Sequence, residues 1–296
     1  MRRSATVIDG KAAAAAVISR VREKVESLKV RGVVPGLAVI LAGEDPASQV
    51  YVRNKIKKCA ELGIDSRRID LPGDVTMEEM LAVIGKLNAD PAVHGILVQF
   101  PPPPQLSQEK IIDAISPRKD VDCFSSCNVG RILEGRTDGF LPCTPAGVLE
   151  LLRFAGIDPA GKHAVIVGRS NIVGKPLAAL LMQKNKGANA TVTVVHSGTP
   201  DIARYTRDAD ILIAAVGKPR FITGDMIKPG AAVIDVGINR VPGENGKSVL
   251  AGDVDFESAV NVAGAITPVP GGVGPMTIAM LMNNAVLAAE QAVKNA

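Results

Sequence analysis

The stretch VIVGRSNIVGKP, residues 165–176, constrains the fold more than any other part of the chain. Val165 to Val167 form a β-branched run too short for a buried helix, and Gly168 and Gly174 allow a tight turn into a helix. A strand, a glycine turn and a helix start are the parts that hold a dinucleotide's pyrophosphate. The spacing is G-x-S-x-x-x-G, one residue longer than the usual fingerprint, with Ser170 in place of the second glycine. An ordinary strand-to-helix turn therefore remains an alternative.

The residues around this turn favour NADP over NAD. The next expected strand, Thr191 to Val195, ends in His196 and Ser197, where a protein that selects NAD usually places a carboxylate. Arg169 lies inside the turn, so a guanidinium and a hydroxyl can both reach a 2′-phosphate. A solvated loop arginine and a turn-forming serine fit each residue taken singly, whereas the two together behind a phosphate turn favour the cofactor.

Short apolar runs alternate with helical stretches along most of the chain, which is the pattern of an α/β protein with parallel strands. A helix over 145–154 is interpreted as the connector between two such series. The expected strands are 37–41, 66–69, 95–98, 163–167, 191–195, 211–215, 231–236 and 263–266, and the other expected helices lie near 46–62, 76–88 and 275–293.

Size, charge and cysteine content exclude several classes of protein. The 296 residues suffice for two domains, and 34 basic against 30 acidic residues leave a net charge of only +4, so nucleic-acid binding is not expected. No 18-residue apolar span appears and the start of the chain lacks a signal-peptide core, so we expect a cytoplasmic protein without membrane contact. The four cysteines and three histidines show no metal-ligand spacing, and no metal is assigned.

One stripe of the predicted helix over 46–62 carries chemical groups. Ser48, Tyr51 and Lys55 recur at spacings of three and four residues, which places them on one side of a helix. On the margin of the core, Lys55 is placed to reach over a cleft. A lysine whose stem lies along the core, with the tyrosine ring beside it, fits the same spacing.

Polar groups also follow the strand that ends in Val98. Gln99 comes at the carboxyl end of that strand, where open α/β sheets gather ligands, and its amide can donate and accept. Asp122, in the loop KDVDCF, can cap a helix or accept from a ring N–H and an amino group together. The segment TPVPGGVGPMT, residues 267–277, predicts a rigid turn able to lie flat against a planar ligand, or a plain strand-to-helix connection.

Several of these segments together resemble the family of bifunctional methylenetetrahydrofolate dehydrogenase/methenyltetrahydrofolate cyclohydrolases. The resemblance implies an α/β fold with two three-layer domains flanking a cleft, and it implies a homodimer. A folate-binding catalytic domain would comprise 1–146 plus 272–296, and a Rossmann-like NADP domain 147–271. The segments that carry the resemblance are IDGK (8–11), YVRNK (51–55), NADPAVHGILVQFP (88–101), KDVD (119–122), PCTP (142–145), GRSNIVGKP (168–176) and TPVPGGVGPMT (267–277).

The same resemblance implies two reactions and a role for each group. The first is oxidation of 5,10-methylenetetrahydrofolate to 5,10-methenyltetrahydrofolate with NADP, and the second is hydrolysis of that product to 10-formyltetrahydrofolate. Lys55 would assist the water, Gln99 would orient and polarise Lys55, Asp122 would anchor the pterin, and Tyr51 would stack on the folate rings. The implied substrate-binding residues are Ser48, Tyr51, Lys55, Val98, Gln99, Phe100, Asp122, Pro270, Gly271, Gly272, Val273 and Gly274, and the implied cofactor-binding residues are Gly168, Arg169, Ser170, Ser197, Ile238 and Thr277.

Two stretches depart from the family pattern, both on the folate side. KDVD is usually followed by Gly-Phe-His, whereas this chain has Cys123, Phe124 and Ser125, so a required positive φ at the first position would fall on a cysteine. After Gln99 the family commonly has Leu-Pro-Leu-Pro, and here Phe100 precedes four prolines. Two other functions therefore stay open: a folate- or nucleotide-binding protein with impaired catalysis, and an NADP dehydrogenase of another small metabolite, similar to shikimate dehydrogenase.

Overall fold

The computed structural model describes residues 4–136, 138–243 and 248–294, which form two compact units. We name the units by their sheets, the six-stranded unit and the three-stranded unit. Helices α1 (Gly10–Val30) and α10 (Val273–Lys294) each begin in the six-stranded unit and continue into the other. The six-stranded unit comprises residues 1–15, 132–135 and 142–277, and the three-stranded unit comprises 16–131, 136–141 and 278–296.

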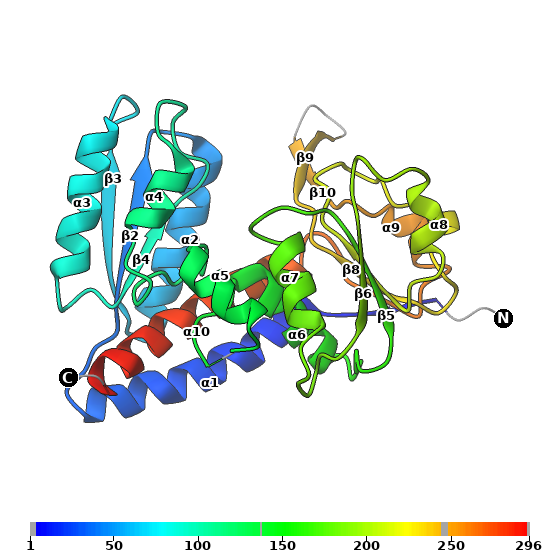
Figure 1. The fold of residues 1–296 in the computed structure, drawn as a ribbon, viewed down its shortest axis with the longest axis horizontal. Helices are drawn as coiled ribbons and strands as arrows, with labels where there is room; N and C mark the ends of the chain where they lie inside the picture. The colour runs from blue at the N-terminus through cyan, green and yellow to red at the C-terminus, as the bar shows by residue number, and fades with distance from the viewer. Residues whose placement is uncertain (1–3, 137, 244–247, 295–296) are drawn as a thin grey trace. The chain divides into compact units, whose positions relative to one another are not determined.

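The three-stranded unit is built on a parallel sheet with β2 in its centre. All seven residues of β2 are buried, as expected for a parallel strand covered on both faces. Ala38 and Ile40 face Met80 of α3 and Ile111 of α4 within one apolar cluster. The sheet order is β3 (Asp65–Leu71), β2 (Gly36–Ala42), β4 (Gly95–Val98), and its helices include α2 (Pro46–Leu62), α3 (Met77–Ala89) and α4 (Gln108–Ala114) (Figure 1).

Local signals fix the ends of α2 and α3. Asp45 accepts the backbone N–H of Ser48 at 2.7 Å before α2 begins, and Gly63, at φ 72°, ends that helix in the left-handed conformation that glycine adopts without strain. Thr76 and Glu79 form a capping box at the start of α3. Because α2 begins at Pro46, Ser48, Tyr51 and Lys55 all lie within the helix, on the stripe that their spacing predicts.

The six-stranded unit is also a parallel sheet with helices on it. Its strand order is β1-β11-β8-β7-β5-β6, and every neighbouring pair is parallel. The strands are β1 (Thr6–Val7), β5 (His163–Val167), β6 (Thr191–Val195), β7 (Ile211–Ala214), β8 (Ala232–Asp235) and β11 (Ala265–Ile266). The remaining elements of the chain are α5 (Ser126–Leu133), α6 (Cys143–Phe154), α7 (Gly174–Leu181), α8 (Ile202–Thr206), η1 (Gly224–Met226), α9 (Phe256–Ala259) and the antiparallel pair β9 (Asn239–Pro242) and β10 (Ser248–Ala251).

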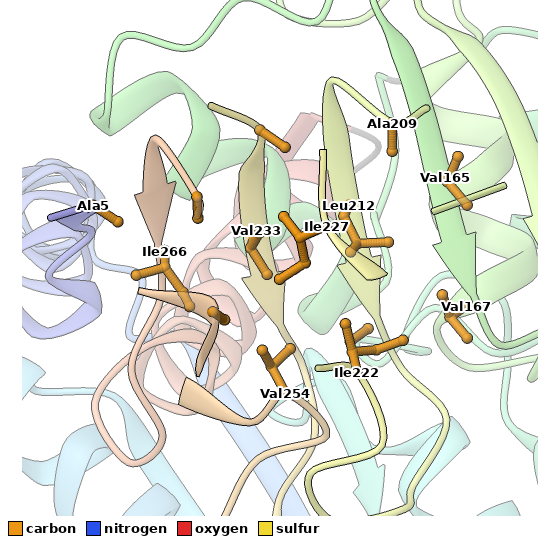
Figure 2. Packing of buried hydrophobic residues seen from close by; sticks show 14 of the residues in the cluster. Ala5, Val165, Val167, Ala209, Leu212, Ile222, Ile227, Val233, Val254 and Ile266 are labelled. Atoms are coloured by element: carbon orange, nitrogen blue, oxygen red, sulfur yellow. The ribbon is translucent and has the colours of Figure 1, made fainter. Parts of the chain in front are cut away.

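Alternate residues of these strands form the core of the six-stranded unit. Val165 of β5, Leu212 of β7 and Val233 of β8 lie in one layer, and Ile222 and Val254 pack against them from the connecting segments (Figure 2). The next residue in each of these strands, Ile166, Ile213 or Ile234, is fully buried as well. Since α7 contacts β5 and β6 and buries Leu177, Leu180 and Leu181, both faces of the sheet are covered. The expected three-layer α/β architecture with a Rossmann-like sheet is confirmed.

The strand order also locates the edge at which a ligand is expected. β5 lies between β6 and β7, so the chain leaves β5 in one direction to form β6 and then crosses to the other side to form β7. Ligands of open α/β sheets bind in the crevice at such a reversal, outside the carboxyl ends of the strands. In this unit the reversal lies between β5 and β7, so a ligand is expected at the loops after these two strands.

Each strand and helix expected from the sequence is present, with ends within two residues of the prediction. The strand β1 and the pair β9–β10 were not predicted, because two-residue strands and short half-exposed hairpins carry little hydrophobic pattern. The ends of the expected catalytic domain, residues 1–3 and 295–296, as well as residue 137 within it, lie outside the described residues. In the part of the chain that the structure describes, no helix combines the length and the apolar character needed to cross a membrane.

Candidate active site

Lys55 and Gln99 meet at the carboxyl end of β4. Nζ of Lys55 donates to Oε1 of Gln99 at 3.0 Å, and Nε2 of Gln99 donates to the carbonyl oxygen of Phe100 at 2.8 Å. The Gln99 backbone N–H is held by the Ile40 carbonyl at 2.9 Å. Lysine only donates here and the carbonyl only accepts, so both partners fix the same orientation of the amide. Nζ is thereby held in one place by a rigid strand end.

The other residues of the α2 stripe, Ser48 and Tyr51, precede Lys55 in the same helix. Ser48 is buried, Lys55 is half-buried and Tyr51 keeps 39% of its surface exposed, so its ring is available to a planar ligand. One turn further, Cys59 is fully buried, with its Sγ 3.5 Å from Sδ of Met282. Burial raises the pKa of the Cys59 thiol to about 12, so this cysteine belongs to the core.

Asp120 and Asp122 have different surroundings. Asp120 is 3% exposed and accepts from the backbone N–H groups of Phe124 at 3.2 Å and Ser125 at 2.9 Å, and from the Asn128 side chain at 2.9 Å. These bonds use Asp120 to hold the loop. Asp122 is half-buried in the same loop. The sequence pattern did not mark Asp120 as the residue that holds the loop.

Cys123 has the backbone conformation expected at the first departure from the family pattern. Its φ is 60°, in the left-handed region, and its side chain is fully buried with Sγ 3.2 Å from the carbonyl oxygen of Phe140. Burial, with the charges of Asp120 and Asp122, raises the pKa of the Cys123 thiol well above its usual range. A positive φ is required at this position, and the cysteine adopts it.

The two departures from the family pattern touch each other. The rings of Phe100 and Phe124 lie with centroids 6.2 Å apart and planes tilted by 41°, within the usual range for aromatic pairs. Phe100 follows Gln99 directly and Phe124 follows Asp122 by two residues. The ring pair therefore joins the loop that carries the amide to the loop that carries the carboxylate.

In the six-stranded unit, the turn after β5 has no room for side chains at its two glycines. A Cβ at Gly168, where φ is 131°, would stand 2.1 Å from the carbonyl oxygen of Ala215, and a Cβ at Gly174 would stand 2.1 Å from that of Gly168. Oγ of Ser170 accepts from the N–H groups of Val173 at 3.1 Å and Gly174 at 3.5 Å. Ser170 thus holds the turn that leads into α7, and the bare turn in front of the helix fits a diphosphate.

The side chains expected to select the cofactor are exposed in this unit. Arg169 lies on the turn after β5 and Ser197 on the turn after β6, both exposed. Nδ1 of His196 accepts from the N–H of Gly198 at 3.1 Å, and Oγ1 of Thr199 accepts from the N–H of His196 at 3.0 Å. These two bonds shape the turn that presents the Ser197 hydroxyl. The donor set of a guanidinium and a hydroxyl fits a phosphate.

The segment 267–277 packs as a tight turn. Gly271 has φ 110°, and a Cβ at Gly272 would stand 2.6 Å from the carbonyl oxygen of Pro268. Gly10 at the start of α1 lies against the same turn, since its Cβ would stand 1.9 Å from the oxygen of Gly272. Close packing of backbone on backbone accounts for the glycines of both motifs.

Two expected cofactor residues lie beside this turn. Cδ1 of Ile238, which is 44% exposed, lies 3.6 Å from the point where a Cβ at Gly274 would stand. Oγ1 of Thr277 lies 3.0 Å from Oγ1 of Thr144 in α6. The structure therefore brings Ile238 to the turn of Pro270 to Gly274, while Gly168, Arg169 and Ser170 lie on the turn after β5.

Sequence reasoning missed two buried carboxylates of the six-stranded unit, Asp235 and Asp253. Asp235 is the last residue of β8, at a strand end like the one that drew attention to Gln99. Its position in the run AAVID was a usable signal. Asp253 follows β10, which was not predicted, so nothing in the pattern marked it.

The comparisons with known proteins match the chain over nearly its whole length. The family model described as the tetrahydrofolate dehydrogenase/cyclohydrolase catalytic domain matches residues 8–122, and the model of the NAD(P)-binding domain matches residues 142–293. The bifunctional protein FolD of Moorella thermoacetica is 58% identical over 97% of this chain and 99% of its own. The crystal structure of the bifunctional FolD enzyme from Campylobacter jejuni is 49% identical with a TM-score of 0.92, covering 97% of this chain and 99% of its own. The Trypanosoma brucei enzyme, crystallised with NADP and an inhibitor, is 41% identical with a TM-score of 0.93, covering 99% of both chains.

Proposed function

Since the chain belongs to the tetrahydrofolate dehydrogenase/cyclohydrolase family, we propose which of its residues carry the two reactions. The protein is a bifunctional enzyme that oxidises 5,10-methylenetetrahydrofolate with a nicotinamide cofactor and hydrolyses the methenyl product to 10-formyltetrahydrofolate. Membership of this family excludes one of the two functions left open above, an NADP dehydrogenase of another small metabolite. The residue roles below are our proposal.

The hydrolytic step is assigned to Lys55 and Gln99, and the 3.0 Å bond between them carries the assignment. Water adds to the cationic methenyl carbon and gives up a proton, which the neutral amine at Nζ accepts. The bond from that carbon to N5 then breaks: N5 takes up a proton, the hydroxyl group on the carbon gives one up, and the carbon becomes the formyl group on N10. Gln99 holds one N–H of the amine through Oε1, so the lone pair of Nζ points elsewhere.

The oxidation step depends on positioning more than on acid or base catalysis. A hydride leaves the methylene carbon, and the resulting positive charge is shared by the two nitrogens of the substrate. When bound, the cofactor supplies the nicotinamide that takes up this hydride. Asp122 anchors the pterin through its ring N–H and amino group, and Tyr51 stacks on the rings.

We propose that NADP is preferred over NAD. The exposed Arg169 and Ser197 support this, because a guanidinium and a hydroxyl bind a 2′-phosphate, and the relative crystallised with NADP supports it as well. Arg169→Ala should lower the preference for NADP over NAD, measured as the ratio of kcat/KM values. An unchanged ratio would reject the role of Arg169.

Domain limits, assembly and location are also proposals. We propose a folate-binding domain of 1–146 plus 272–296, an NADP domain of 147–271 and a homodimer, as the family resemblance implies, and a cytoplasmic location, as the sequence pattern led us to expect. The separate family models for the two halves of the chain support two functional domains. Sedimentation equilibrium of the purified enzyme tests the dimer, and a single species of monomer mass would reject it.

The variant Lys55→Met tests the assignment of the hydrolytic step. Methionine keeps an unbranched apolar side chain but cannot take a proton, so hydrolysis of methenyltetrahydrofolate should fall by about 10² to 10⁴. NADP reduction by methylenetetrahydrofolate should fall much less. Lys57→Met, two residues away on the exposed side of α2, is the matched control and should keep both rates. Equal losses of both reactions in Lys55→Met would mean that Lys55 only positions the substrate.

A further inference from the structure

A pair of buried carboxylates ties together three segments at the carboxyl edge of the six-stranded sheet. Asp253 is fully buried and Asp235 is 3% exposed. One oxygen of Asp253 accepts from the backbone N–H groups of Val216 at 2.6 Å and Gly217 at 2.8 Å. The other accepts from the Asn239 side chain at 2.9 Å. Asp253 thus holds the loop after β7 and the start of β9 at once.

Asp235 in turn holds the segment that carries Asp253. Its carboxylate accepts from the backbone N–H groups of Gly237, Asp253 and Val254, each at 2.9 Å. Each bond joins a buried carboxylate to a backbone amide, and hydrogen bonds to charged groups contribute more to stability than those between neutral groups. The loop that leads to Ile238 is therefore tied to the same cluster.

Two glycines show how tightly this cluster is packed. A Cβ at Gly237 would stand 2.3 Å from Oδ1 of Asp253, and a Cβ at Gly252 would stand 1.8 Å from Oδ2 of Asp235. Burying two carboxylates side by side is unfavourable, and burial together with Asp253 raises the pKa of Asp235 to about 6.

The loop that Asp253 holds lies at the strand reversal, where open α/β sheets bind ligands. It follows β7, and it lies directly on the turn after β5, because a Cβ at Gly168 would stand 2.1 Å from the oxygen of Ala215. Val216 and Gly217 come immediately after Ala215. A shift of these two amides therefore changes the space in front of the dinucleotide turn.

We propose that Asp253 is a positioning residue for the dinucleotide, which fixes the loop of Val216 and Gly217 opposite the turn after β5, with Asp235 as its support. The proposal rests on the proposed binding of NADP at these loops. Asp253 touches neither substrate nor reacting atoms, so it acts on cofactor binding through the two amides. Its removal should raise the KM for NADP more than it lowers kcat.

The substitution Asp253→Asn separates this role from the alternatives. The amide offers one accepting oxygen where the carboxylate offers two, so either the loop amides or Asn239 must face an N–H group. We expect a rise of about tenfold in the KM for NADP, the equivalent of one lost buried hydrogen bond. Hydrolysis of methenyltetrahydrofolate without NADP reports whether the enzyme is folded, and it should fall less than NADP reduction.

A charge exchange with Asn239 provides the decisive second variant. In Asp253→Asn/Asn239→Asp the new amide can give its oxygen to the loop and donate its N–H to the new carboxylate. The double variant should bring the KM for NADP back toward the wild-type value, whereas Asn239→Asp alone should raise it. Asp255→Asn is the control, since the side chain of this neighbouring aspartate makes no cap bond at α9.

Each outcome decides the proposal. A raised KM in Asp253→Asn that is restored in the double variant supports the positioning role. An unchanged KM in Asp253→Asn overturns it, and so does a double variant no better than the single one, because the carboxylate would then serve only the fold. If the wild-type enzyme does not reduce NADP at all, that result rejects the proposed function and not the positioning role of Asp253.

Discussion

Cys123 offers a measurement of backbone strain beside the folate site. In the left-handed region an L-residue other than glycine carries a penalty of roughly 1–2 kcal/mol, which glycine does not. Cys123 has φ 60° and is fully buried. Cys59 is the matched control on the same unit, since it is also a fully buried cysteine but lies inside α2.

The prediction compares glycine with alanine at both positions. At Cys59, glycine should be less stable than alanine by about 2 kcal/mol, from roughly 1 kcal/mol of helix propensity and roughly 0.8 kcal/mol for one buried carbon. At Cys123, which lies in a loop, glycine costs about 0.4–1 kcal/mol in chain entropy and roughly 0.8 kcal/mol for the buried carbon. The relief of about 1–2 kcal/mol offsets these costs, so the difference between the two variants should fall close to zero. The glycine and alanine variants both lack the sulfur atom. The difference between their stabilities therefore does not contain the effect of losing it.

Urea unfolding of the four variants measures these differences. Because both cysteines belong to the three-stranded unit, one unfolding transition reports on both sites. The variant Cys123→Gly can still adopt φ 60°, so the loop of Asp122 should keep its conformation and the KM for methylenetetrahydrofolate should stay near the wild-type value. The reasoning is refuted if glycine is worse than alanine by the same amount at Cys123 as at Cys59.

Two further predictions concern the ring pair and the buried carboxylate. In a double-mutant cycle of Phe100→Leu and Phe124→Leu, the stability changes should differ from additivity by about 0.5–1.5 kcal/mol, whereas additive changes would show that the rings do not interact. The folded pKa of Asp235, about 6, lies above its ordinary value of 3.8, so its contribution to stability is fully present below pH 4 and is lost as the pH rises through 6. This loss, on the order of 3 kcal/mol, should be absent in Asp235→Asn when unfolding is followed from pH 4 to 8. The same pH dependence in both proteins would assign it to another group.

The parts that the sequence predicted are those set by local pattern. Gly168 and Gly174 mark a turn because no side chain fits there, and the stripe of Tyr51 and Lys55 follows from helical spacing alone. Gln99 could be found because strand ends carry polar groups at the ligand-binding edge of a sheet. The bond from Lys55 to Gln99 then follows once α2 and β4 lie in one unit.

The parts that escaped prediction depend on contacts between distant segments. Asp120 and Asp122 look alike in the sequence, and only the bonds from Phe124, Ser125 and Asn128 show that Asp120 holds the loop. The role of Asp253 depends on Val216 and Gly217, 37 and 36 residues away in sequence. No periodicity encodes such a meeting, since it arises only when the strand order is in place.

The most direct test of the account follows both reactions in one solution. Purified enzyme is given methylenetetrahydrofolate with NADP or with NAD, while the reduced cofactor, methenyltetrahydrofolate and 10-formyltetrahydrofolate are measured over time. The account predicts that NADP is reduced faster than NAD and that 10-formyltetrahydrofolate forms with only transient methenyl product. Absence of NADPH at high enzyme concentration, or a lasting build-up of methenyltetrahydrofolate at the rate of its uncatalysed hydrolysis, would contradict it.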